Sequence, residues 1–70
     1  MITYTLVRQD RRDGLVSIQL HLFRDRLPAS VTTITTEPPA AAMKRFAEAR
    51  VHLRRLGVRD NNDASWGYAG

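Results

Sequence analysis

Apolar and polar residues alternate along the first half of the chain with the period of two that is typical of β-strands. The pattern predicts strands over residues 2–8 and 15–23, and a run of β-branched residues predicts a third strand over residues 30–36. The second strand has a clear apolar face, which consists of Val16, Ile18, Leu20 and Leu22.

Turn residues separate these three segments. Asp13-Gly14 follows a polar stretch and indicates a hairpin loop, since glycine readily adopts a positive φ. After the second strand we expect a break over residues 24–28, because Pro28 lacks a backbone donor and disfavours a helical conformation at Leu27.

A helix is predicted over residues 39–56. Pro39 suits the first helical position, and Gly57 suits a left-handed C-terminal cap. The apolar residues recur at helical spacing and form one stripe, with Met43 at its edge. This stripe comprises Ala42, Phe46, Ala49, Leu53 and Leu56.

The order of elements predicts an α+β fold, β-β-β-α, with a three-stranded antiparallel sheet packed against one C-terminal helix. Residues 58–70 form either a C-terminal tail or a short fourth strand, since Trp66 and Tyr68 are two residues apart. The helix stripe is expected to cover Ile2, Tyr4 and Leu6 together with the apolar face of the second strand. The opposite sheet face is expected to be uncovered; it carries Thr3, Thr5, Ser17, Gln19 and His21.

The size and composition favour one small domain over residues 1–70. Cysteine is absent, which excludes disulfides and cysteine-ligated metal centres. A chain of this length buries only about 60% of its unfolded surface, so a binding partner or self-association as a homodimer would add stability. No apolar run approaches the roughly 20 residues of a membrane span, and we expect a cytoplasmic protein of a bacterial host.

The net charge of +4 is concentrated in the predicted helix. Residues 39–56 contain five basic residues and only Glu48 as an acid, so their net charge equals that of the whole chain. The basic residues are Lys44, Arg45, Arg50, Arg54 and Arg55. This distribution has two interpretations: a surface for an anionic partner, or a solvated helix exterior whose arginine stems shield the apolar stripe.

Catalytic and metal-binding patterns are lacking. The two histidines, His21 and His52, have no metal-ligand spacing, and no serine lies in a nucleophile-elbow motif. The pairs Asp10/Asp13 and Asp60/Asp63 lie in predicted turns, where aspartate commonly caps backbone groups. We therefore expect no enzymatic activity, no cofactor and no metal.

Two resemblances bear on the binding partner. The order Tyr4, Val7-Arg8, Thr35-Thr36 and residues 40–42 resembles the plant ethylene-response-factor domain and the phage integrase arm-binding domain, which implies DNA binding through the sheet. However, the tryptophan and arginine residues that those domains carry within their strands are missing here.

A second set of short motifs resembles the N-terminal half of HicB-like antitoxins. The motifs are Tyr4-Thr5, Asp13-Gly14, Leu27-Pro28, Val31-Thr32, Thr36 and Ala40. That family implies a β-β-β-α domain that binds and blocks a small toxin. This sequence departs from the family pattern at Ala29, which replaces a glycine, and at Pro38-Pro39, which replaces an acidic pair.

The sequence thus predicts a small protein-binding module that inhibits or adapts a larger partner, in the manner of phage or mobile-element accessory proteins such as anti-CRISPRs and antitoxins. The partner is expected to be an acidic protein or a nucleic-acid-binding complex. The alternative is a basic nucleic-acid-binding domain. The candidate partner-binding residues are Arg11, Arg12, Arg24, Arg26, Lys44, Arg45, Arg54, Arg55, Trp66 and Tyr68.

Overall fold

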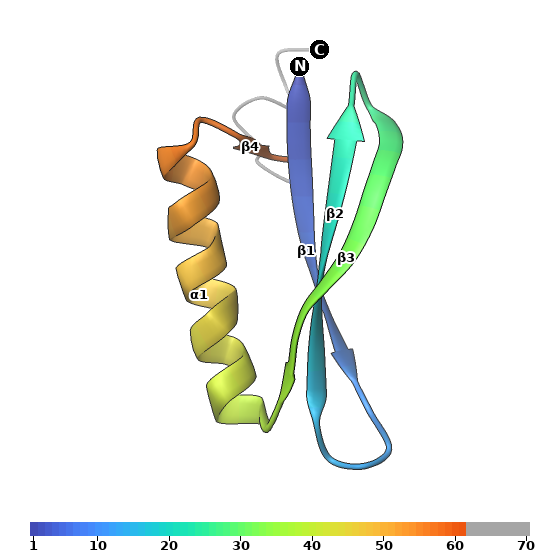
Figure 1. The fold of residues 1–70 in the computed structure, drawn as a ribbon, viewed down its shortest axis with the longest axis vertical. Coiled ribbons are helices and arrows are strands. Elements are labelled where there is room, and N and C mark those ends of the chain that lie inside the picture. Colours follow the sequence, from blue (N-terminus) through green and yellow to red (C-terminus); the bar gives the residue numbers. More distant parts are fainter. Residues whose placement is uncertain (62–70) are drawn as a thin grey trace.

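The computed structural model describes residues 1–61, which form a four-stranded sheet with one helix across a single face (Figure 1). The elements in chain order are β1 (Ile2–Asp10), β2 (Val16–Arg24), β3 (Leu27–Glu37), α1 (Pro39–Arg55) and β4 (Arg59–Asp60). The strand order is β3-β2-β1-β4, and the first three strands are antiparallel neighbours. The predicted α+β fold is confirmed.

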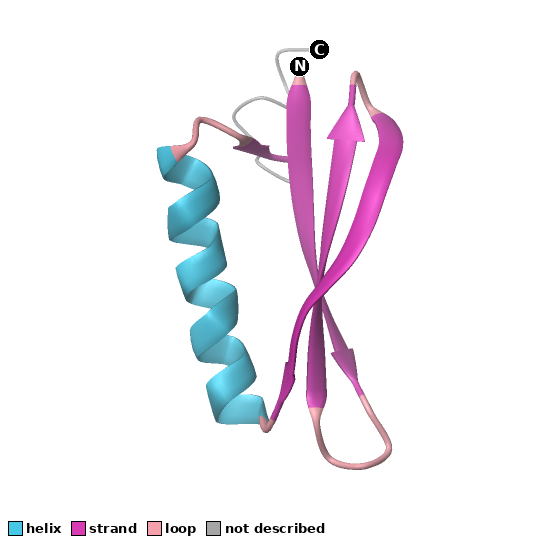
Figure 2. Ribbon diagram, viewed as in Figure 1, coloured by secondary structure: helices cyan, strands magenta, loops and turns pink. Residues whose placement is uncertain are grey.

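The short fourth strand that was expected within residues 58–70 is present as β4. β4 consists of residues 59–60 and pairs in parallel with β1, with Thr3 opposite Arg59 and Tyr4 opposite Asp60. Trp66 and Tyr68 lie outside the described residues. The segment from β3 through α1 to β4 therefore joins the two edges of the sheet, and Figure 2 shows the helix on one side of it.

The core lies between α1 and the two strands β2 and β3, against which the helix chiefly packs. Val16, Ile18 and Ala42 form its buried centre, with Leu6 and Phe46 packed around them. The predicted helix stripe is thus confirmed at Ala42 and Leu53, which are buried, and at Phe46 and Ala49, which are half-buried. The side of the helix that faces β1 and β4 therefore packs less closely against the sheet.

Two residues expected in the core are exposed instead. Ile2 is 54% exposed, because it pairs with Arg24 at the end of the β1–β2 ladder. Leu56 is 65% exposed, because it is the C-cap residue, where the chain turns away from the core. The prediction for both residues was wrong, since periodicity alone does not show where an element ends.

The polar sheet face is also less open than the alternation predicted. Thr3 and Ser17 are only 2% and 5% exposed. The Thr3 hydroxyl donates a hydrogen bond to Asn61 Oδ1 at 3.1 Å, and the Ser17 and Thr36 hydroxyl oxygens lie 3.0 Å apart. Hydrogen bonds of this kind allow hydroxyl groups to be buried.

The break expected over residues 24–28 is a tight turn, with Asp25 and Arg26 at φ +51° and +69°. Pro28 does not end the sheet but lies within β3 opposite Phe23, since an edge strand tolerates a residue without an N–H donor. β3 also shifts register twice relative to β2. One shift leaves Ile34 as the extra residue between Thr33 and Thr35.

Two glycines adopt the positive φ that the sequence predicted, Gly14 at +84° and Gly57 at +80°. Gly57 ends α1: its N–H donates to the Arg54 carbonyl at 3.0 Å, and the Val58 N–H donates to the Leu53 carbonyl at 3.1 Å. This pair of bonds is a Schellman motif. It turns the chain from the helix into β4.

Candidate anion-binding site

The loop arginines do not form one surface. Arg11 and Arg12 lie between β1 and β2, whereas Arg24 and Arg26 lie at the turn between β2 and β3. Because successive hairpin connections alternate ends of an antiparallel sheet, these two pairs lie at opposite ends of the molecule (Figure 1). A single partner contact that uses all four side chains would have to span the length of the sheet.

One loop arginine, Arg11, and both loop carboxylates form ion pairs within the molecule. Arg11 Nη2 lies 3.2 Å from Asp13 Oδ2, and the Leu15 N–H donates to Asp13 Oδ1 at 3.0 Å. The backbone N–H of Leu15, and secondarily the Arg11 guanidinium, lower the pKa of Asp13 below its ordinary value of 3.8. At the other end of the sheet, the Met1 ammonium group donates to Asp25 Oδ1 at 2.7 Å.

The cations of α1 differ in whether they form an ion pair. Arg45 is paired: its Nε lies 3.6 Å from Glu37 Oε2 and its Nη1 lies 3.2 Å from Glu48 Oε2. Across residues 1–61, no carboxylate lies within ion-pair distance of the other helix cations. These unpaired cations are Lys44, Arg50, Arg54 and Arg55, all exposed.

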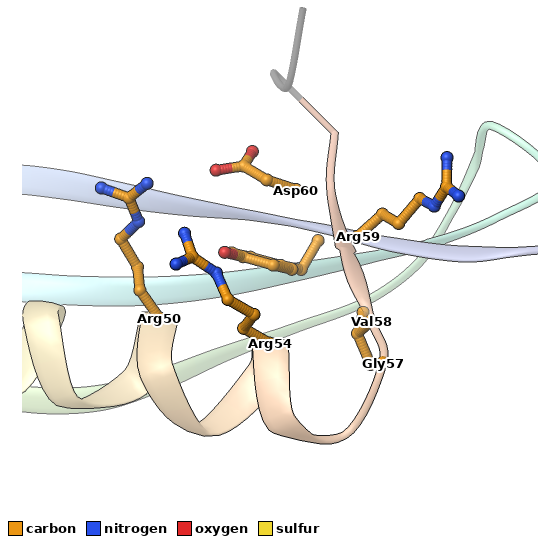
Figure 3. A pocket seen from close by; sticks show the side chains of 7 residues that line it. Arg50, Arg54, Gly57, Val58, Arg59 and Asp60 are labelled. Carbon is orange, nitrogen blue, oxygen red and sulfur yellow. The ribbon is translucent and has the colours of Figure 1, made fainter. Parts of the chain in front are cut away.

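A cleft of about 460 Å³ opens between α1 and the β1–β4 pair, on the side of the helix that packs least against the sheet. Its lining comes from β1, α1, β4 and the connection between the last two. The lining residues are Tyr4, Arg50, Arg54, Gly57, Val58, Arg59 and Asp60. In Figure 3, the Arg50 and Arg54 side chains rise from the helix toward Asp60, whereas Arg59 extends in the opposite direction.

Tyr4 contributes a polar group to this cleft although its side chain is only 4% exposed. Its backbone carbonyl accepts the Asn61 N–H at 2.6 Å, but its hydroxyl makes no hydrogen bond with any residue of the described chain. Two unpaired guanidinium groups and one phenol therefore line the same cavity. All three are hydrogen-bond donors, so their natural ligand is an anion.

Sequence reasoning missed the main members of this site. Arg54 was among the candidate partner-binding residues, but Tyr4 and Arg50 were not: Tyr4 was expected under the helix stripe, and Arg50 was counted only among the basic residues of the helix. The spacing of four residues between Arg50 and Arg54 was the available signal, since it places both on one flank of a helix. The cleft itself depends on the pairing of β4 with β1.

Arg54 and Arg55, which the sequence grouped together, line different sides of α1. Arg55 lines a wider and more open groove of about 760 Å³ between the helix and β3. That groove also contains Ile34, Arg45, Val51 and His52. Its lining is more apolar and already contains the Arg45–Glu48 ion pair, which makes it the weaker anion site.

No group of three histidine, aspartate or glutamate residues within residues 1–61 could hold a metal ion. His21 Nε2 lies 3.2 Å from Gln19 Oε1, which gives the ring a local hydrogen-bond partner. Among the described residues, no helix is long and apolar enough to cross a membrane.

Comparison of the chain with protein-family models, with curated proteins and with solved structures gave no match. The protein is therefore classified by its fold and by the residues on its surface. It is a small α+β domain with an arginine-lined cleft beside its single described helix.

Proposed function

We propose that this protein is a non-enzymatic protein-binding module that docks its helix α1 on an acidic surface of a larger partner and thereby inhibits or adapts that partner. The observation that carries the proposal is the gathering of four unpaired cations on one helix. Within residues 1–61, Lys44, Arg50, Arg54 and Arg55 have no carboxylate partner. Arg12 and Arg24 also form no ion pair there, but they lie at opposite ends of the sheet.

Unpaired cations suit recognition because no internal ion pair must break before the partner binds. They are also interspersed with apolar side chains, since Val51 is 50% exposed and Met43 is 38% exposed. Arginine and methionine are enriched in protein–protein interfaces, where an apolar centre is surrounded by polar groups. This mixture favours a protein partner.

The sheet supports nucleic-acid binding less well than the helix supports protein binding. The face turned away from α1 carries mainly hydroxyl, amide, imidazole and apolar groups. Among the described strand residues, its one basic side chain is Arg59, which pairs with Thr3. Its hairpin connections also carry carboxylates, with Asp13 in one and Asp25 in the other. Such groups repel phosphate, whereas a protein that depends on phosphate contacts usually presents a denser basic surface.

The proposal is tested by capture from a bacterial host lysate on the immobilised full-length chain, with and without nuclease. Two helix variants, K44Q/R55Q and R50Q/R54Q, are compared with the loop variant R11Q/R12Q, which removes the same charge from the β1–β2 loop. We expect a protein partner that survives nuclease treatment, is retained by the loop variant and is lost by at least one helix variant. Retention by both helix variants would overturn the proposal.

A second measurement separates a nucleic-acid partner from a protein partner. Affinity for labelled duplex DNA is followed against salt concentration, since each neutralised phosphate contributes a log–log slope of about −0.9. We expect weak binding with a shallow slope. Capture that disappears on nuclease treatment, together with a steep slope that both helix variants reduce, would assign the helix face to nucleic acid instead.

A further inference from the structure

We propose that the cleft between Tyr4, Arg50 and Arg54 is a pocket for a single carboxylate, which a glutamate side chain of the partner protein supplies. This inference rests on the proposed function and refines it. It names one chemical group and one place on the helix face. The remaining helix cations, Lys44 and Arg55, then attract the partner from outside the pocket.

The arginine pair has suitable geometry for a carboxylate. Arg50 and Arg54 are one helical turn apart, and both side chains rise from the helix on the side of the Asp60 carboxylate (Figure 3). A guanidinium group presents parallel N–H donors that match the two oxygens of a carboxylate. Two such groups beside one cavity can therefore hold an anion from two directions.

Tyr4, which lines the same cleft from β1, supplies the third donor. The Tyr4 hydroxyl makes no hydrogen bond to another described residue, but it is not a buried orphan, since the buried side-chain atom without a hydrogen-bond partner in the described chain is Glu37 Oε2. The hydroxyl can therefore donate to a ligand in the cleft that Tyr4 lines. A bound carboxylate oxygen would accept this hydrogen bond and complete the coordination of the phenol.

The rest of the lining favours glutamate over a phosphate group. Val58 and the ring of Tyr4 provide apolar surface for the methylene groups of a glutamate side chain. The Asp60 carboxylate also lines the cleft, so repulsion increases with each negative charge on the ligand. A phosphate monoester carries about two charges at neutral pH, whereas a carboxylate carries one.

The test is a titration of the isotopically labelled full-length chain with a poly-glutamate peptide, followed by NMR. We expect the largest shifts at the amides of Tyr4 and residues 57–60. R50Q/R54Q should weaken binding about tenfold or more, and Tyr4→Phe about threefold, because hydrogen bonds to a charged group are lost. K44Q/R55Q, which removes the same charge from the same helix outside the cleft, should weaken binding less than twofold.

A matched phosphoserine peptide completes the design and is expected to bind more weakly than the glutamate peptide. An equal loss of peptide affinity in R50Q/R54Q and K44Q/R55Q would overturn the pocket, because the peptide would then be attracted by the charge of the whole helix. The proposal that α1 docks on an acidic partner would still stand. Tighter binding of phosphoserine would overturn the choice of carboxylate. If the native chain does not bind poly-glutamate but R50Q/R54Q still fails to capture the lysate partner, the carboxylate pocket is wrong and the proposed function stands.

Discussion

The backbone N–H of Val58 donates a hydrogen bond to the carbonyl of Leu53 at a distance of 3.1 Å. Between these residues, Gly57 takes a φ of +80°, so the chain leaves α1 and enters β4 beside Tyr4. Both Gly57 and Val58 line the arginine cleft. One helix C-cap thus fixes a wall of the candidate site.

Gly57→Ala should lower the free energy of unfolding by about 1–2 kcal/mol, because a side chain makes the left-handed conformation unfavourable. A Cβ at this position meets no atom within 4 Å, so the cost is conformational rather than steric. Urea denaturation measures it. The same substitution should also weaken binding of the poly-glutamate peptide, since the wall of the cleft moves with the cap.

Gly14→Ala is the matched control for this prediction. Gly14 has a φ of +84°, and its Cβ would also meet nothing within 4 Å, but it lies in the β1–β2 loop. We expect a similar loss of stability with no change in peptide binding. An unfolding free energy of Gly57→Ala equal to that of the native chain would show that the left-handed cap is not required.

The parts of the fold that the sequence predicts correctly are those set by local periodicity and by glycine. Alternation in β2 and the stripe containing Ala42 and Phe46 each depend on neighbours a few residues away. The break over residues 24–28 was predicted from Pro28, but the positive φ of Asp25 and Arg26 was not, because neither residue is a glycine. Nor could the register shift at Ile34, which depends on how β3 meets β2.

The candidate site was predictable only in its charge. The concentration of cations in the helix follows directly from the sequence. Which of them stay unpaired depends on the position of Glu37 at the end of β3, close to Arg45. The cleft requires Asp60 to pair with Tyr4 across more than fifty residues of chain, and no local pattern encodes that contact.

Ile18→Val should destabilise the protein by about 1 kcal/mol, because Ile18 is fully buried in the core beside Val16 and Ala42. Ile2→Val removes the same methylene group from a side chain that is 54% exposed and should change stability by less than about 0.5 kcal/mol. Chemical denaturation of both variants gives the comparison. An equal loss of stability in the two variants would contradict the finding that Ile18 lies in the core and Ile2 lies outside it.

The hydroxyl groups of Ser17 and Thr36, 3.0 Å apart, should be energetically coupled. Ser17→Ala and Thr36→Ala each remove one partner of a hydrogen bond worth about 1 kcal/mol. A double-mutant cycle measured by urea unfolding should therefore give a coupling energy of about 0.5–1.5 kcal/mol. A coupling energy of zero would show that the bond contributes nothing to holding β3 against β2.

Asp13 should make the fold sensitive to acid. Its pKa in the folded protein is lowered below 3.8, first by the Leu15 N–H and then by Arg11, so the ionised carboxylate stabilises the folded state. This stabilisation is fully present above the unfolded value near 3.8 and is lost as the pH falls through the lower folded value. Asp13→Asn should therefore flatten the decline in stability below that pH.

NMR titration of the Asp13 carboxyl carbon measures the same effect directly. Arg11→Gln should leave the pKa of Asp13 still lowered, because the Leu15 N–H, which donates at 3.0 Å, is the largest single cause. Asp13→Asn retains an acceptor for that N–H and removes only the charge, so it isolates the titration from the loop geometry. A folded-state pKa of Asp13 at or above 3.8 would contradict this account, and the loop would then contribute nothing to acid sensitivity.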